Sequence, residues 1–230
     1  MNFKMMGRFL AQIVALEAAF LVPAFAISLY FGESGAGKAF LLSMAVMALL
    51  AGVLFLLCRG GDKFFGAKDG LVCVSIGWIV LSLLGALPFW LSREIPSFVD
   101  AFFETVSGFT TTGASILPEV ERLSKSLLYW RSFTHWVGGM GVLVLFLALT
   151  PRMGEGAVFL MRAESPGPIK SKLVPKVGGT AKILYLIYVV LTLCEVLALR
   201  LAGESWFSAV CHSFTTMATG GFSIYDTSLA

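Results

Sequence analysis

The sequence predicts an all-α polytopic membrane protein. Apolar residues make up 57% of the 230 residues and charged residues only 13%, whereas a soluble domain has about 45–50% and about 25%. The apolar residues gather in long blocks, and a span needs roughly 20 of them to cross about 30 Å of hydrocarbon. The predicted spans are residues 9–31, 40–58, 71–91, 127–150 and 180–201.

The first two spans form a transmembrane hairpin within residues 1–66. A cleaved signal peptide is the alternative for the first block, because Lys4 and Arg8 precede an apolar stretch. The block continues to Tyr30 and contains Glu17, so we expect it to stay as a span. Glu17 has no partner visible in the sequence, and a charge at the centre of a membrane helix costs about 2.5–3.5 kcal/mol on insertion scales.

The orientation follows from the distribution of Lys and Arg, which favour cytoplasmic loops. With the N-terminus in the cytoplasm, eleven basic residues lie inside and six outside. The inside set is Lys4, Arg8, Arg59, Lys63, Lys68, Arg152, Arg162, Lys170, Lys172, Lys176 and Lys182, and the outside set is Lys38, Arg93, Arg122, Lys125, Arg131 and Arg200. We therefore predict a multi-pass protein with a cytoplasmic N-terminus.

The helix expected between the third and fourth spans is too short to cross the membrane. Ser97 is a plausible N-cap, and a helix over 97–109 would be about 18 Å long, which is half a bilayer. The Thr/Gly-rich loop 110–115 follows it. Non-helical backbone at membrane depth is tolerated only where protein buries it or where it lines a watery cavity. This segment is therefore a candidate re-entrant pore loop.

The same pattern occurs again 108 residues later, and internal repeats carry strong weight in predicting a fold. The identical pairs are Ala101 and Ala209, Thr111 and Thr219, Gly113 and Gly221, and Ser115 and Ser223. The predicted organisation has four parts: a hairpin over 1–66, a first pore unit over 67–151, a cytoplasmic linker over 152–179 and an incomplete second unit over 180–230. The first unit contains spans 71–91 and 127–150, half-helix 97–109 and loop 110–115. The second contains span 180–201, half-helix 205–216 and loop 217–223.

Both loops have the residue types of a cation filter. Glycine permits the backbone angles that turn successive carbonyls toward one axis, threonine offers a hydroxyl oxygen, and the negative end of each half-helix faces the loop. The pattern is similar to the Thr-Val-Gly-Tyr-Gly filter of potassium channels. The alternative is that these small residues only let helices pack closely. The candidate ion-binding residues are Thr110, Thr111, Thr112, Gly113, Ala218, Thr219, Gly220 and Gly221, with potassium expected at Thr111, Thr112, Gly113, Thr219, Gly220 and Gly221.

Four motifs resemble the Trk/Ktr/HKT superfamily, and specifically its bacterial Trk-type potassium-uptake branch. They are SGFTTTGAS at 107–115, WRSFTHWVGGMGVLVL at 130–145, RAESPGPIK at 162–170 and HSFTTMATGGFSIYD at 212–226. The resemblance implies potassium uptake across the bacterial cytoplasmic (inner) membrane, through a pore of four units. It also implies a homodimer and a cytosolic nucleotide-binding regulatory subunit. A serine at the position of Gly113 goes with sodium permeation in the superfamily. Because the chain ends after the second loop, we expect a fragment that does not conduct alone.

Several polar residues have two interpretations each. Glu104 and the matching His212 can tune the field at the outer mouth or contact a neighbouring span, and we favour the contact. His135 can be a ligand or proton carrier, but a packed histidine is the favoured interpretation because no second ligand lies at helical spacing. Arg131 is expected to anchor at the membrane interface, and Glu195 to pair with Arg200. The glycines of the fourth span are expected to pack it closely behind the filter: Gly138, Gly139 and Gly141.

The competing functions are a secondary transporter and an enzyme. An ion-coupled transporter with re-entrant loops is the main alternative, although both loops lack the ionisable groups such sites commonly have. Ser107, Ser115, His135 and His212 form neither a GxSxG nor an HExxH motif, so we expect no enzyme. We also expect no cofactor and no nucleic acid as partner. The linker 152–179 can contact anionic membrane lipid or a regulatory partner, and a plain positive-inside loop explains its charge equally well. The resemblance favours the partner. Whether transport is channel-like or a symport stays open.

Overall fold

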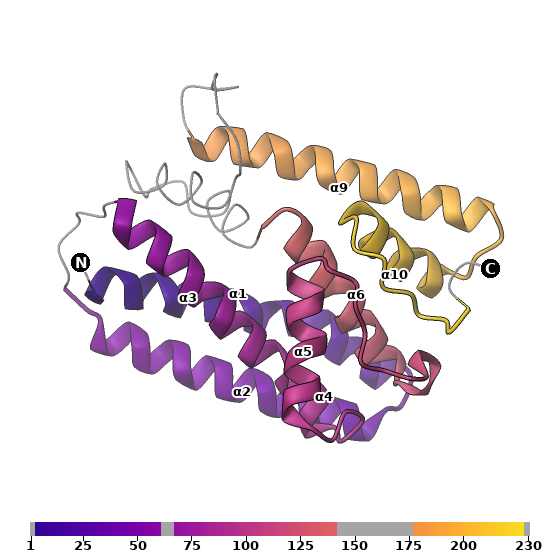
Figure 1. Ribbon diagram of the computed structural model, residues 1–230, viewed down its shortest axis with the longest axis horizontal. Helices are drawn as coiled ribbons and strands as arrows, with labels where there is room; N and C mark the ends of the chain where they lie inside the picture. Colours follow the sequence, from indigo (N-terminus) through magenta and orange to yellow (C-terminus); the bar gives the residue numbers. More distant parts are fainter. Residues whose placement is uncertain (1–2, 61–66, 142–176, 228–230) are drawn as a thin grey trace.

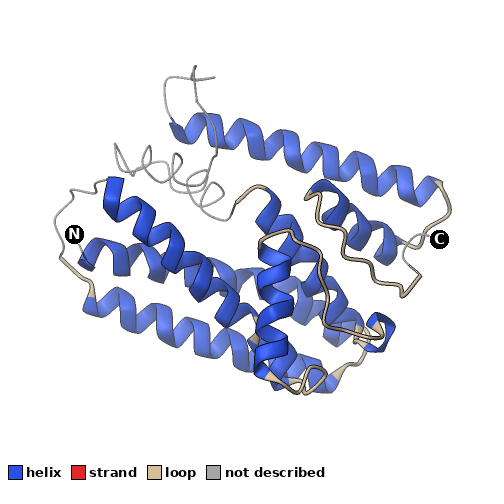
Figure 2. Ribbon diagram, viewed as in Figure 1, coloured by secondary structure: helices blue, strands red, loops and turns tan. Residues whose placement is uncertain are grey.

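The computed structural model describes residues 3–60, 67–141 and 177–227 of the chain, and these residues form helices joined by loops, with no strand among them (Figure 2). The predicted linker 152–179 lies outside the described residues except for its last three positions. Figure 1 shows α1, α2 and α3 side by side, with α5, α6 and α10 beside them and α9 along the far side. The helices are α1 (Phe3–Tyr30), α2 (Ser34–Leu57), α3 (Ala67–Gly85), α4 (Leu87–Leu91), α5 (Phe98–Phe109), α6 (Lys125–Gly139), α9 (Val177–Leu201) and α10 (Trp206–Met217).

Four helical segments among the described residues are long and apolar enough to cross a membrane. They are Phe3–Tyr30, Ser34–Leu57, Asp69–Leu91 and Lys182–Leu201. Many large apolar side chains on α2 and α9 are exposed, Leu49 and Leu186 among them. Contact with lipid rather than water accounts for such outward apolar faces. The chain is therefore a multi-pass membrane protein, as predicted.

The fifth predicted span, 127–150, falls only partly within the described residues. Its described part is α6, which begins at Lys125 and ends at Gly139. Residues 142–150 lie outside the description, so the structure does not test the length of this span.

The third predicted span is interrupted near its end. α3 ends at Gly85, and α4 begins at Leu87 with Pro88 in its first turn. Proline has no N–H group to continue the helical hydrogen bonds, and its ring crowds the preceding turn. The side chain of Trp130 contacts the chain at this break, where its Nε1 donates a 2.9 Å hydrogen bond to the carbonyl of Gly85.

The core joins the leading hairpin to the helices that follow it. α1 packs against α2, α3 and α6, α5 packs against α3 and α6, and α10 packs against α6 and α9. Large side chains such as Phe9, Phe40 and Trp130 are fully buried there. α6 thus lies between α1 and α5 on one side and α10 on the other.

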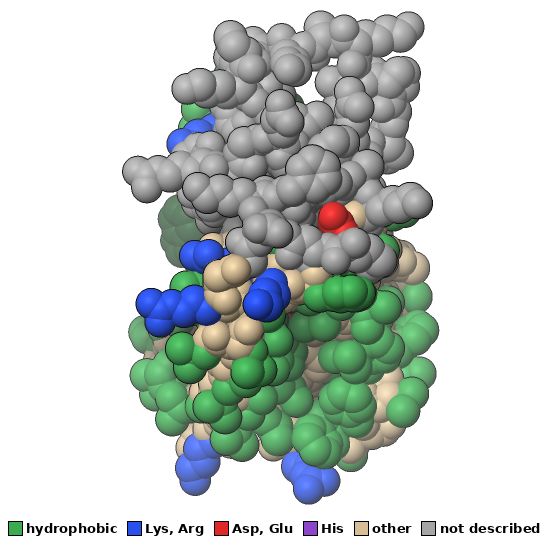
Figure 3. Space-filling view, turned by 90° about the vertical axis from the view of Figure 1, so that its left-hand side faces the viewer, with side chains coloured by type: hydrophobic (Ala, Val, Ile, Leu, Met, Phe, Trp, Pro, Cys, Tyr) green, Lys and Arg blue, Asp and Glu red, His purple; other side chains and the backbone are tan. Residues whose placement is uncertain are grey.

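One end of the molecule gathers the start of α1, the end of α2 and the start of α3 (Figure 1). Figure 3 looks onto this end, where Lys and Arg side chains lie beside apolar ones. The prediction of a cytoplasmic N-terminus assigns this end to the inside of the cell.

Candidate functional site

The two short helices α5 and α10 have the same length and the same start. Each has 12 residues. Ser97 caps α5 by accepting a hydrogen bond from the N–H of Asp100, and Ser205 caps α10 by accepting one from Ser208. A serine N-cap satisfies one of the free N–H groups in the first helical turn. The two caps are 108 positions apart, which is the offset of the sequence repeat.

Both helices also end in the same way. After α5, the N–H of Thr111 bonds to the carbonyl of Gly108 and that of Thr112 bonds to Ser107, each at 3.0 Å. After α10, the matching bonds run from Thr219 to Thr216 at 2.8 Å and from Gly220 to Thr215 at 2.9 Å. This pair of bonds is the Schellman motif, which requires one residue in the left-handed region.

That left-handed residue is a threonine in both loops. Thr111 and Thr219 each have φ of 55°, in a region where a β-branched residue is a real outlier. Strained backbone persists where the surroundings determine it, and it gathers at functional sites. The two matching glycines also have positive φ, 76° at Gly113 and 92° at Gly221.

The backbones of the two loops meet. A Cβ atom on Gly113 would overlap the carbonyl oxygen of Gly220. Only a residue without a side chain fits at this approach. Of the candidate residues, Gly113 of the first loop is therefore brought against Gly220 and Gly221 of the second. Thr110, Thr111 and Thr112 precede this contact in the first loop, and Ala218 and Thr219 precede it in the second.

α6 packs closely behind both loops, at positions where its neighbours leave no room for a side chain. A Cβ on Gly138 would overlap the carbonyl of Phe109, and one on Gly139 would lie 2.8 Å from the Cα of Ala218. These two glycines therefore have the packing role that the sequence predicts. Gly141 has φ of 74° just beyond the end of α6.

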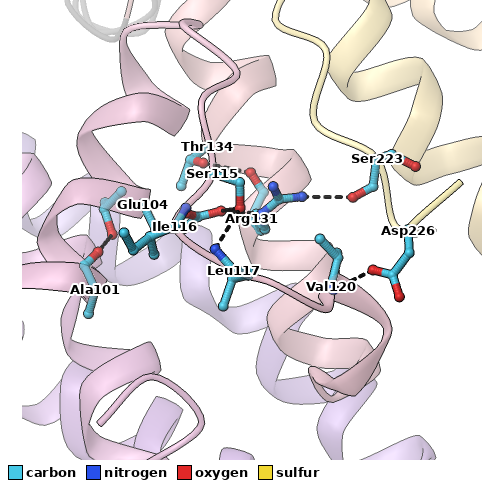
Figure 4. Close-up of polar contacts among 11 residues, drawn as sticks. Ala101, Glu104, Ser115, Ile116, Leu117, Val120, Arg131, Thr134, Ser223 and Asp226 are labelled. Carbon is cyan, nitrogen blue, oxygen red and sulfur yellow. Dashed lines mark hydrogen bonds and ion pairs between the residues drawn. The ribbon is translucent and has the colours of Figure 1, made fainter. Parts of the chain in front are cut away.

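Arg131 of α6 is buried and connects the two loops, which corrects its predicted role as an interface anchor. The side chain is 2% exposed. Its Nε lies 2.6 Å from Oε1 of Glu104, and its Nη1 donates a 2.7 Å hydrogen bond to the carbonyl of Ser223 (Figure 4). The guanidinium also lies over the Phe222 ring, 3.5 Å from the centroid. The place of Arg131 near the start of α6 in the sequence gave no sign that the side chain is buried.

Glu104 contacts the neighbouring α6 helix, as the favoured interpretation predicts. Its carboxylate also accepts hydrogen bonds from the Ser115 hydroxyl at 2.9 Å and from the Ile116 N–H at 3.0 Å. The matching His212 contacts the Oγ of Ser223 at 3.4 Å, and Ser208 at 3.2 Å. The same pair of positions is thus bonded in both units, once through a carboxylate and once through an imidazole.

A second set of bonds links the segments that follow the two loops. A carboxylate oxygen of Asp226 accepts a 2.6 Å hydrogen bond from the N–H of Val120 (Figure 4), and the N–H of Asp226 donates to Glu121 at 3.2 Å. Val120 begins a short 3₁₀ helix, Val120–Arg122. The sequence analysis did not identify this contact, because the two segments lie about a hundred residues apart.

His135 is packed within the protein. It is fully buried and stacks on Phe222 with ring centroids 4.0 Å apart. A Cβ on Gly220 would lie 2.6 Å from the imidazole ring. The Ser107 carbonyl lies beside the ring, but neither ring nitrogen is in hydrogen-bond geometry with a described residue. This position agrees with the interpretation of His135 as a packed histidine. Through His135, α6 contacts Gly220 and Phe222 of the second loop.

The two acidic residues within the predicted spans lie in different surroundings. Glu17 of α1 is buried with its Oε1 beside Gly85, and its carboxylate has no hydrogen-bond partner among the described residues. The predicted pair of Glu195 with Arg200 is wrong. Arg200 donates to the backbone carbonyl of Glu204 at 3.1 Å.

The N-terminal end of α6 is held by two more carboxylates. Glu33 accepts hydrogen bonds from the N–H groups of Lys125 and Ser126 at 2.6 and 3.1 Å. Glu94 accepts one from the N–H of Ser124 at 2.7 Å. Burial, with a contribution from the nearby charge of Glu33, raises the pKa of Glu94, although the bonds from Ser124 act in the opposite direction. The N-terminus of a helix is the positive end of its dipole, so carboxylates placed there are stabilising.

Comparison with known proteins identifies a match over most of the chain. Residues 36–230 match the sequence profile of the TrkH family, which is described as cation transport protein. The Trk system potassium uptake protein TrkH of Halomonas elongata is 39% identical over 231 residues, and that of Escherichia coli is 40% identical over 233. Both alignments cover 100% of this chain and 48% of the relative. The chain thus spans about half the length of the curated relatives it matches.

A solved structure shares the fold. The crystal structure of the potassium transporter TrkH from Vibrio parahaemolyticus superposes with a TM-score of 0.81 and 33% sequence identity. It is matched over 100% of this chain and 46% of its own. The sequence and structure comparisons therefore agree.

Proposed function

Because this chain belongs to the TrkH family of cation transport proteins, we propose that it forms part of a pore through which potassium ions are taken up. Its relatives are named as transport proteins, which supports transport rather than enzymatic catalysis. The chain matches about half of each relative, so the proposal concerns its contribution to the pore.

The observation that carries the proposal is the meeting of two equivalent loops. A ring of backbone carbonyls can replace the hydration shell of potassium, and such a ring needs loops from several units at one place. Here the Gly113 backbone lies against the Gly220 carbonyl. α5 and α10 end beside these loops, and the C-terminal end of a helix carries a negative partial charge that favours a cation.

The proposed ligands are those that the sequence indicates. Potassium would be held by backbone carbonyls and threonine hydroxyls of Thr111, Thr112, Gly113, Thr219, Gly220 and Gly221, with Thr110 and Ala218 at the inner edge of each loop. Neither 110–115 nor 217–223 contains an acidic or basic residue. Selectivity would therefore rest on oxygen geometry, and Gly113 favours potassium over sodium by resemblance.

The test is growth rescue at low potassium. The complete gene product is expressed in a bacterium that lacks its own potassium uptake, with Gly113→Ser and Gly221→Ser beside it. We expect the wild type to restore growth, and both variants to lose rescue or admit sodium. Gly32→Ser is the matched control, because Gly32 also has positive φ, 71°, but lies in the α1–α2 loop, where an added Cβ would meet nothing within 4 Å. Rescue that ignores both loop substitutions would mean that the loops only pack helices.

Three further parts of the proposal rest on the family resemblance. They are a homodimer, a cytosolic nucleotide-binding regulatory subunit on the inner face, and a location in the bacterial inner membrane with the N-terminus inside. Cross-linking in native membranes and labelling of single cysteines from either side would test them.

A further inference from the structure

We propose that Arg131 is a positioning residue that fixes the spacing between the two loops and thereby sets the preference for potassium over sodium. The inference rests on the proposed function, because it assigns a role within the same site. Arg131 would act through the backbone, without touching the ion.

The first part of the argument is that the charge of Arg131 is buried and paired with a carboxylate. The side chain is 2% exposed, and its partner Glu104 is 0% exposed. A buried charge is costly unless it is paired and hydrogen-bonded. The Nε of Arg131 meets Glu104 at 2.6 Å, so the pair holds α6 against α5. A guanidinium offers several donors in a rigid planar fork, which leaves Nη1 for a second partner.

The second part is that the two partners of Arg131 connect it to different loops. Glu104 also binds the Ser115 hydroxyl and the Ile116 N–H. Ser115 is the last residue of the first loop, and Ile116 comes directly after it. Nη1 donates a 2.7 Å hydrogen bond to the carbonyl of Ser223, the last residue of the second loop. Figure 4 shows Arg131 between Glu104 and Ser223. One rigid group therefore links the outer ends of both loops.

The third part is how near these bonds lie to the proposed ligands. Ser115 and Ser223 each lie two residues beyond the glycines Gly113 and Gly221. The Ser223 carbonyl is turned toward Arg131, and Phe222 is covered by the guanidinium at 3.5 Å. Any change in the length or direction of these contacts shifts the carbonyls just before them. Selectivity by a carbonyl filter depends on cavity size or on the number and field of its dipoles, and both change with loop spacing.

The arrangement is not repeated in the second unit of this chain. The residue that matches Glu104 is His212, which contacts Ser223 and Ser208. Ser223 is thus held at its hydroxyl by His212 and at its carbonyl by Arg131. The charged pair therefore acts at one junction between two units.

The experiment compares Arg131→Lys and Arg131→Met with the wild type in the complete gene product. Uptake of potassium and of sodium is measured in cells, and each rate is divided by the amount of protein in the membrane. Lysine keeps the charge but cannot bridge Glu104 and Ser223 with a planar fork. We expect the potassium-to-sodium ratio to fall roughly tenfold in both variants, about the effect of losing one hydrogen bond to a charged group. Arg122→Met is the matched control, because Arg122 forms an exposed ion pair with Glu119, and its ratio should stay as in the wild type.

The outcomes separate the inference from the proposed function. If the wild type takes up no potassium, the proposed function fails. If the wild type is selective and Arg131→Lys keeps the same ratio per protein, Arg131 has no role in selectivity and the inference is overturned. If Arg131→Met does not reach the membrane, it is replaced by the double variant Glu104→Gln/Arg131→Met. This variant removes both charges together and is compared with Arg131→Lys in the same way. An unchanged ratio in that double variant would equally overturn the inference.

Discussion

The backbone of Gly113 lies so close to the carbonyl oxygen of Gly220 that a Cβ atom on Gly113 would overlap that oxygen. The matching Gly221 has open space around it. The two glycines therefore occupy equivalent positions in the sequence repeat but different surroundings.

Gly113→Ala is expected to harm the protein more than Gly221→Ala. Both substitutions place a side chain in the left-handed region, which costs about 1–2 kcal/mol. Only the first also pushes the two loops apart. Potassium uptake per membrane protein should thus fall much further in Gly113→Ala. Equal losses in the two variants would show that strain alone decides the effect.

Thr111→Gly should raise stability and lower uptake. The φ of 55° is strained for threonine, so glycine would relieve about 1–2 kcal/mol, while the loop would lose a hydroxyl oxygen. Arg93→Gly is the control, because Arg93 has φ of 65° outside the loops. It should stabilise the protein in a thermal shift assay in detergent and leave uptake unchanged. If Thr111→Gly takes up potassium as fast as the wild type, the Thr111 hydroxyl is not a ligand of the proposed site.

Glu33→Ala should destabilise the start of α6. The substitution removes the acceptor for the N–H groups of Lys125 and Ser126, and hydrogen bonds to charged groups contribute about 1.5–3 kcal/mol. Thermal unfolding in detergent measures the loss. Glu119→Ala removes a carboxylate from an exposed ion pair, where the expected cost is only about 0–1 kcal/mol. Similar melting temperatures for the two variants would contradict the prediction.

The stability of the protein is expected to depend on pH through the titration of Glu94. Its pKa is raised above the ordinary value of 4.5, mainly by burial. The folded protein then binds this proton more tightly than the unfolded chain does, so its contribution to stability is full below pH 4.5 and is lost as pH rises through the folded pKa. Glu94→Gln should therefore flatten this part of the pH–stability curve. A curve that falls identically in the variant would assign the effect to another group.

Glu17→Met should stabilise the protein. The carboxylate is buried without a hydrogen-bond partner among the described residues, and an unsatisfied buried polar group costs about 1–3 kcal/mol. Methionine is flexible and adapts to irregular space. A higher melting temperature with unchanged uptake would give Glu17 no part in transport. A higher melting temperature with lost uptake would mark it as a functional carboxylate.

The sequence predicted the helical features that depend on local pattern. Apolar blocks indicate spans directly, and Ser97 and Ser205 mark helix starts because a hydroxyl at that position satisfies a free N–H group. The repeat was visible because the two segments align without a gap. The strained Thr111 and Thr219 were not predicted, since threonine rarely adopts positive φ.

Tertiary polar contacts were predicted less well. Arg131 was placed at the interface because it lies near a helix end, yet Glu104 pairs with it from another helix. A useful signal was present, since an acidic residue in a half-helix and a basic one in the next span both need a partner inside a membrane. The break between α3 and α4 was also foreseeable from Pro88.

The carboxylates around α6 have a mechanical consequence. Glu33 and Glu94 hold its first residues from two separate loops, and Glu104 holds Arg131 about two turns further along. The N-terminal end of α6 is therefore fixed in place and tied to the leading hairpin through Glu33. Any rearrangement of this helix that keeps these bonds must move its C-terminal end, so the hairpin supports the helix that packs behind the loops.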